Sequence, residues 1–141
     1  MRYNLRAVMT QTRDLETALL FNADESSYLF SCPDIFQRIA ASQKIRFNKV
    51  THFFLPALGP DYTAGFMGFY QSAKGSVVDM DTWNICLVGP RGLHELVRSW
   101  DFAFRNLTVI ELPDNLEAPL PAEDEESKGG EGEASKPLFK L

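Results

Sequence analysis

The stretch from Thr51 to Gly68 limits the possible folds of this chain more than any other part of the sequence. It begins with a short apolar run, His52–Leu55, of the length expected for a buried β-strand. Two prolines and a glycine (Pro56, Gly59 and Pro60) then break the chain into a loop. After the loop, apolar residues repeat at the spacing of one helix face: Tyr62, Phe66, Phe69, Tyr70 and Ala73. The stretch therefore predicts a strand, a sharp loop and a helix, a unit that presents chemical groups at the carboxyl end of a strand.

The predicted loop carries almost no group that performs chemistry. Asp61 is its only ionisable residue, and no histidine or cysteine lies between Pro56 and Tyr62. A loop at this place in an α/β enzyme normally supplies acids, bases or metal ligands. The sequence therefore predicts the framework of an active site without its reactive residues.

The residues around the loop resemble a known metal-binding motif. Phe54-Leu55, the loop, and Gly65-Phe66-Met67-Gly68 resemble the second motif of the metallo-β-lactamase superfamily. They are more similar still to the long form of tRNase Z (ribonuclease Z), the endonuclease that removes the 3′ trailer from precursor tRNA. In the catalytic version the segment reads Phe-Leu-Thr-His-x-His-x-Asp-His-x-x-Gly-Leu-x-Gly. On this sequence, the three histidine positions are Ala57, Gly59 and Tyr62, and the aspartate position is Asp61.

These replacements imply that the chain has no metal site in the loop. Zinc needs imidazole nitrogens at this spacing to hold two ions and to activate a water molecule. A methyl group, a hydrogen atom and a phenol at positions 57, 59 and 62 do not replace them. We therefore expect no catalytic, cofactor-binding or metal-ligating residue in this chain.

The architecture of the long tRNase Z family offers an explanation for the loss. Its members contain two lactamase-like halves, of which the N-terminal half has generally lost the metal ligands. A second segment supports this resemblance: Tyr28–Cys32 followed by Gln37-Arg38 matches a strand, loop and helix start of the family, although Pro33-Asp34-Ile35 replaces the usual Gly-Glu-Gly. The resemblance covers roughly residues 1–112. It implies an α/β fold of the metallo-β-lactamase αββα sandwich type, of which this chain supplies the first α/β unit.

Charge divides the chain into two parts. Residues 111–141 contain nine acidic and three basic residues, whereas residues 1–110 contain ten acidic and eleven basic residues. The net charge of −5 is therefore a property of the C-terminal end, and the rest lacks the strongly basic character of an independent nucleic-acid binder. We expect a degenerate lactamase-like domain over residues 1–112 and a disordered acidic linker or tail, rich in Pro, Gly and Glu, over residues 113–141.

The two cysteines and the N-terminal sequence give indications about the cellular compartment of the protein. Cys32 and Cys86 have no CxxC spacing, so buried thiols in a reducing compartment are the preferred interpretation, with a disulfide or a metal role as the alternative. The N-terminus has no apolar core of a secretory signal, and no segment reaches transmembrane length. The family resemblance implies the nucleus or the mitochondrion, and we expect no membrane partner.

The remaining patterns predict the elements of one α/β layer. We expect strands at 3–10, 17–23, 28–32, 52–55, 83–88 and 107–112, and helices at 34–43, 62–74 and 91–104. Asp34 is expected to cap the first helix, and Gly75 to end the second. Gly65 and Gly68 inside the second helix suggest that another backbone packs closely there. Because helices cover only one face, the opposite face of the sheet is expected to lack a second layer.

Two segments have both a functional and a structural interpretation. Ser42–Lys49 contains Lys44, Arg46 and Lys49, and is either an RNA-binding patch or, as we favour, a solvated connector. The turn Gly89–Gly92 either seats a phosphate on free N–H groups or, as we favour, only joins a strand to a helix. His94 is expected on the surface of that helix.

By resemblance, the expected function is that of the N-terminal, metal-free part of a long-form tRNase Z in tRNA 3′-end processing. The family is a zinc-dependent endoribonuclease, but this chain should be inactive alone, with zinc held only by the catalytic C-terminal half. That half, in the same gene or a separate chain, is the expected partner, and precursor tRNA is bound through the assembled enzyme. A stand-alone protein-interaction domain with a lactamase-like fold and no RNA role is the alternative. A hydrolase with other ligands is disfavoured, because His52 and His94 are the only histidines.

Overall fold

One mixed β-sheet forms the centre of the structure, a computed structural model that describes residues 2–10, 16–79 and 81–113. Its strands are β1 (Asn4–Met9), β2 (Ala18–Asn22), β3 (Ser27–Phe30), β4 (Val50–Phe54), β5 (Ile85–Gly89) and β6 (Leu107–Glu111). Their order in the sheet is their order along the chain. The first three strands pair antiparallel, and β3 to β6 pair parallel. The strands expected at 17–23 and 28–32 form a hairpin with Asn22 opposite Ser27, so the third strand begins one residue earlier than expected.

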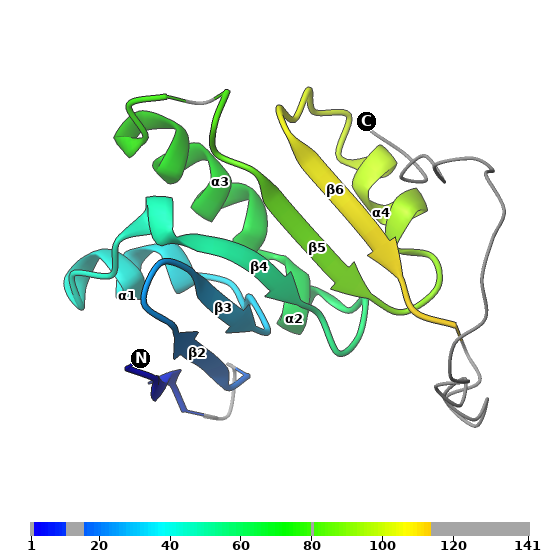
Figure 1. Cartoon of the computed structure of the whole chain (residues 1–141). Coiled ribbons are helices and arrows are strands. Elements are labelled where there is room, and N and C mark those ends of the chain that lie inside the picture. The colour runs from blue at the N-terminus through cyan, green and yellow to red at the C-terminus, as the bar shows by residue number, and fades with distance from the viewer. Residues whose placement is uncertain (1, 11–15, 80, 114–141) are drawn as a thin grey trace, which may run out of the picture.

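Helices connect the parallel strands and lie on one face of the sheet (Figure 1). They are α1 (Phe36–Ser42), α2 (Pro60–Thr63), α3 (Gly65–Ser76) and α4 (Leu93–Ser99), and a 3-10 turn, η1 (Phe47–Lys49), precedes β4. Parallel crossovers are right-handed, so strands added in one direction place all their helices on the same side. None of the helices in the described ranges has the length and apolarity needed to cross a membrane.

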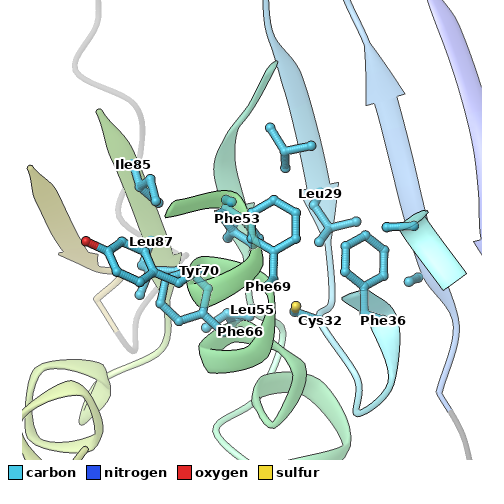
Figure 2. Packing of buried hydrophobic residues seen from close by; sticks show 14 of the residues in the cluster. Leu29, Cys32, Phe36, Phe53, Leu55, Phe66, Phe69, Tyr70, Ile85 and Leu87 are labelled. Carbon is cyan, nitrogen blue, oxygen red and sulfur yellow. The ribbon is translucent and has the colours of Figure 1, made fainter. Parts of the chain in front are cut away.

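The core lies between the sheet and these helices (Figure 2). The strand register aligns one row of side chains on this face: Leu20, Leu29, Phe53, Leu87 and Val109, each at most 4% exposed. From the helix side, Phe66 and Phe69 of α3 each contact the Phe53 ring edge-on, with 5.1 Å between ring centroids. Burying such side chains contributes about 2 kcal/mol each, so this row and α3 account for much of the stability.

The opposite face of the sheet, called the outer face below, is rich in aromatic and aliphatic side chains. Two rows of paired residues make it up: Leu19, Phe30, Phe54, Val88 and Ile110, and Phe21, Tyr28, His52, Cys86 and Thr108. Phe30 stacks on Phe54 at 4.9 Å, and Tyr28 stacks on His52 at 4.8 Å between ring centroids. Within the described ranges, no second layer of helices or strands covers this face, as the sequence predicts (Figure 1).

Two predicted helix boundaries are wrong near α1 and α3. Asp34 does not cap α1, because its Oδ1 accepts the N–H of the adjacent Ile35 at 2.8 Å, and Ile35 itself takes the N-cap position in the left-handed region, with φ 59°. Gly75 does not end α3, which continues to Ser76 before Val77 becomes extended. The expected cap of α1 is thus replaced by a local hydrogen bond of Asp34, and α3 runs two residues beyond its predicted end at residue 74.

The predicted helix 91–104 is also too long. The helix α4 ends at Ser99, and Asp101 turns the chain with a positive φ of 46°. The next aromatic residues fold back onto α3: the Tyr70 ring lies 5.7 Å from that of Phe102 and 5.0 Å from that of Phe104. The predicted acidic tail lies, from residue 114 on, outside the described residues, so the boundary at 112 stays a prediction.

Candidate functional site

The loop after β4 is held at the carboxyl end of the sheet. Leu55 N–H donates to the Val88 carbonyl on the neighbouring strand at 2.8 Å, so strand pairing continues to the start of the loop. Gly59 precedes α2, whose first residue is Pro60, a residue suited to this position because its fixed φ is helical and it needs no partner for an N–H. The Gly59 carbonyl then accepts the N–H of Tyr62 at 3.0 Å and the hydroxyl of Thr63 at 3.1 Å.

A second strand end anchors the same loop. Cys32, just after β3, donates its N–H to the Tyr62 carbonyl at 2.8 Å and accepts the N–H of Gly65 at 2.9 Å. A Cβ atom at Gly65 would collide with the backbone carbonyl oxygen of Pro33. The close backbone approach predicted for Gly65 is therefore confirmed, whereas Gly68 instead faces the side chain of Gln37.

The chemistry available on this loop is limited to one carboxylate and one phenol. Asp61 is exposed and Tyr62 is half-buried, while Ala57 and Gly59 contribute no polar side chain. Within residues 2–10, 16–79 and 81–113, no group of three or more His, Cys, Asp or Glu residues lies close enough to hold a metal ion. The donor set at the loop does not fit the zinc pair of the family motif, because three imidazole positions are filled by groups that do not bind zinc.

The neighbouring turn after β5 is closed by a carboxylate of the chain itself. Glu111 Oε1, at the end of β6, accepts the N–H of Gly92 at 3.1 Å and the N–H of His94 at 2.8 Å. These are the free N–H groups of the helix terminus that would face a phosphate. Gly92 adopts φ 94°, which favours glycine. The structural interpretation of the turn is therefore the correct one.

A hollow of about 480 Å³ lies beside this turn, lined by Arg91, Gly92, His94, Glu95, Arg98 and Glu111. His94 is half-buried on α4, at the helix surface as predicted. The walls of the hollow carry both acidic and basic groups. They include the Glu111 carboxylate, which already accepts hydrogen bonds from the start of α4. The hollow therefore shows no preference for one sign of charge.

The remaining histidine and the cysteines are not part of the loop, although the Cys32 backbone is hydrogen-bonded to it. His52 is on the outer face, where its Nδ1 lies 2.8 Å from Thr51 Oγ1. Both cysteines are free thiols, Cys32 fully buried and Cys86 half-buried, which agrees with the preferred interpretation of Cys32. Burial raises the pKa of the Cys32 thiol far above its usual range, and raises that of Cys86 as well. Neither thiol is therefore activated as a nucleophile.

The basic connector 42–49 has a neighbour that sequence reasoning missed. Arg6 of β1 lines the same surface hollow as Lys44, Arg46 and Lys49. The sequence gives little sign of this neighbour, since Arg6 stands 38 residues before Lys44. The pairing of β1 with β2, and the hydrogen bond from Gln43 Nε2 to the Val8 carbonyl at 2.9 Å, hold β1 beside the connector.

Comparison with known proteins identifies relatives of the N-terminal part of the chain. The sequence model of the tRNase Z endonuclease family matches residues 6–59. This segment includes the β3–α1 region and extends into the loop after β4, so the resemblance to the tRNase Z family is confirmed over these residues. The resemblance to the long form in particular stays a prediction. No curated protein matches the sequence significantly.

Solved structures with similar folds include a tRNase Z and an RNase Z. The human short-form tRNase Z is similar at a TM-score of 0.62 and 17% identity, over 80% of this chain and 46% of that chain. A long-form RNase Z from yeast is similar at a TM-score of 0.63 and 21% identity, over 78% of this chain and 15% of that chain. The metallo-β-lactamase fold protein YhfI from Bacillus subtilis is similar at a TM-score of 0.59 and 12% identity, over 86% of this chain and 50% of that chain. The fold is therefore metallo-β-lactamase-like, and the chain spans at most half the length of these structures.

Proposed function

We propose that this chain, whose residues 6–59 match the tRNase Z endonuclease family, is the metal-free N-terminal part of a long-form enzyme of tRNA 3′-end processing. One observation carries the proposal. The loop of the family's metal motif is kept, with its anchors to Cys32 and Val88, while Ala57, Gly59 and Tyr62 stand at the ligand positions.

A retained loop without ligands favours a supporting role over an independent catalytic one. A two-metal hydrolase that loses its ligands loses both the activated water and the stabilisation of charge in the transition state. The hydrogen bonds of the loop still fix the packing of α2 and α3 on the sheet. We therefore assign zinc and catalysis to a separate C-terminal half and a scaffolding role to this chain.

The outer face supports the presence of such a partner. Phe30 and Ile110 are 41% and 44% exposed, although parallel strands such as theirs are normally covered on both faces. Leu5, on the antiparallel strand β1, is 64% exposed on the same face. A second lactamase-like unit, in the same polypeptide or a separate chain, would cover these side chains. In the assembled enzyme this chain would then assist in binding precursor tRNA.

A trailer-cleavage assay on precursor tRNA tests the proposal. We expect no cleavage by this chain alone, with or without added zinc. A catalytic C-terminal half carrying the complete His-x-His-x-Asp-His motif should cleave slowly alone and at least about ten-fold faster with this chain, at equal zinc. A metal-dependent cut made by this chain alone would refute the proposal.

The assay also separates the alternative, a protein-interaction domain without an RNA role, which the exposed outer face would serve equally well. In that case this chain should neither co-purify with the catalytic half nor change the rate at which that half cleaves precursor tRNA. A stable complex without any effect on cleavage would likewise count against a role in tRNA processing.

A further inference from the structure

A basic hollow lies at the edge of the sheet where β1, β2 and the connector 42–49 meet. It has a volume of about 290 Å³ and is lined by Arg6, Leu20, Asn22, Ala23, Ser27, Lys44, Ile45, Arg46 and Lys49. Two sequence segments, β1 and the connector 42–49, thus contribute four cations to one concave surface, and the hairpin of β2 and β3 contributes the remaining uncharged lining. The volume is at the lower end for ligand sites, which run from about 300 to 1,000 Å³, so it suits a small group better than a large organic ligand.

The polar groups of the hollow include a fixed amide. The Ser27 hydroxyl donates to Asn22 Oδ1 at 2.8 Å, which leaves the Asn22 NH2 group as a further donor. Lys49 Nζ donates to the Asp24 carbonyl at 3.1 Å, which holds that ammonium group at the hairpin loop. Leu20 and Ile45, which are buried or half-buried, form the apolar part of the lining.

The cations of the hollow are not neutralised by the part of the chain that the structure describes. No carboxylate lines the hollow, and no ion pair joins Arg6, Lys44 or Arg46 to a described acidic residue. Asp24 is the nearest acid along the hairpin, and its carboxylate accepts the Arg2 N–H at 3.1 Å. Since residues 1–110 carry nearly equal numbers of acids and bases, this hollow is a local concentration of positive charge.

We infer that the hollow binds phosphate groups of the RNA backbone, as a tRNA-positioning site of the assembled enzyme. The inference rests on the proposed function, which supplies RNA as the polyanion. Several cations around a shallow hollow match a chain of phosphates, each able to accept hydrogen bonds from a guanidinium or ammonium group. None of the described residues that line the hollow is aromatic, which argues against stacking on bases, so contact with the backbone is favoured.

The hollow is separate from the loop that corresponds to the metal motif. Lys49 precedes β4 and Pro56 follows it, so the two sites lie at opposite ends of this strand. Five residues of strand span about 17 Å, several phosphates along an RNA chain. A contact this far from the loop acts on binding and positioning of the RNA, and should affect KM rather than kcat.

Binding of a fluorescent precursor tRNA to the full 141-residue chain tests the inference. The double variant Lys44→Glu/Arg46→Glu should weaken binding at least about ten-fold. The slope of log Kd against log salt concentration should also decrease, by roughly 0.7 to 0.9 for each phosphate contact that is lost. The matched control is Arg38→Glu/Lys74→Glu, two exposed cations on α1 and α3. Equal losses in both variants would show unspecific attraction and overturn the inference.

Two further measurements complete the test. Lys44→Gln/Arg46→Gln removes the charges with less disturbance and should give an intermediate loss, with unchanged thermal unfolding. Inorganic phosphate at constant ionic strength should displace the RNA only at high millimolar concentration, and displacement at low millimolar concentration would assign the hollow to a free small anion and overturn the inference.

The assembled enzyme separates this inference from the proposed function. With the catalytic half present, the Lys44→Glu/Arg46→Glu variant should still stimulate cleavage at saturating RNA but raise KM about ten-fold. Normal stimulation with an unchanged KM would overturn the hollow as an RNA site and leave the proposed function intact. Failure of the unaltered chain to stimulate cleavage would instead remove the proposed function.

Discussion

At the scale of single residues, Gly65 shows how the loop is fixed. It is the first residue of α3, it donates to the Cys32 carbonyl, and the Pro33 carbonyl oxygen lies where its Cβ would be. Because this neighbour is backbone within an anchored turn, it does not move aside as a flexible side chain would. The close contact between α3 and the β3–α1 loop therefore requires glycine here.

Replacing this glycine tests the contact. We expect Gly65→Ala to lower the free energy of unfolding by about 3 kcal/mol, since over-packing outweighs the gain of about 1 kcal/mol in helix propensity. Gly75→Ala is the matched control in the same helix, because nothing lies within 4 Å of its added Cβ, and it should be neutral or stabilising by up to about 1 kcal/mol. Urea unfolding measures both, and equal stability of the two variants would contradict the contact.

The metal content is also decided by single residues. We expect purified, dialysed protein to contain far less than one zinc ion per chain, because Asp61 is the only strong zinc ligand on the loop. Elemental analysis with a catalytic tRNase Z half as the positive control measures this. A stoichiometric, chelator-resistant zinc ion would mean that ligands outside the loop, or in the part of the chain beyond residue 113, form a site.

At the scale of elements, a long-range hydrogen-bond pair organises the end of β6 and the start of α4. Glu111 belongs to the last strand but caps the preceding helix through the N–H groups of Gly92 and His94. A carboxylate at a helix N-terminus also interacts favourably with the helix dipole. The last strand and its helix are thus linked by a side chain as well as by packing.

Removing this cap should destabilise the domain. We expect Glu111→Ala to lower the free energy of unfolding by about 1 to 2 kcal/mol, because two N–H groups lose a charged acceptor. Glu111→Gln keeps one acceptor oxygen without the charge and should cost about half as much. Glu25→Ala, in the exposed hairpin loop, is the control and should change stability by less than about 0.5 kcal/mol. A loss no larger for Glu111→Ala than for this control would show that the cap adds nothing.

The accuracy of sequence reasoning also varies by element. The existence of the strands was predictable, because short apolar runs such as Ile85–Val88 are typical of buried strands. Their order in the sheet was not part of the prediction. The end of α4 was not, because Trp100 and Phe104 continue the helical spacing, and only contact with Tyr70 shows why the chain leaves the helix. Similarly, the lack of ligands in the loop was visible in the sequence, whereas the meeting of Arg6 with Lys44 and Arg46 depends on strand pairing.

At the scale of the whole molecule, the sheet has unequal faces. Its helix face holds the core, while Leu5, Phe30 and Ile110 of the outer face are exposed. Monomeric proteins rarely expose apolar patches above a few hundred Å². Covering such an area contributes several kcal/mol at roughly 25 cal/mol per Å², which is enough to favour association. The same surface that supports a partner in the proposed function should therefore make the isolated chain self-associate.

Light scattering and binding of a dye for apolar surfaces test this expectation. The unaltered chain at tens of micromolar should form dimers or larger species and bind the dye, and a catalytic tRNase Z half should reduce both effects. Phe30→Lys/Ile110→Lys places two charges on the outer face and should shift the chain towards the monomer. Ala41→Lys/Gln71→Lys adds the same charge to exposed positions on α1 and α3, and should leave association unchanged. A sharply unfolding monomer without dye binding would show that the outer face is covered within this chain, and the need for a second lactamase-like unit would disappear.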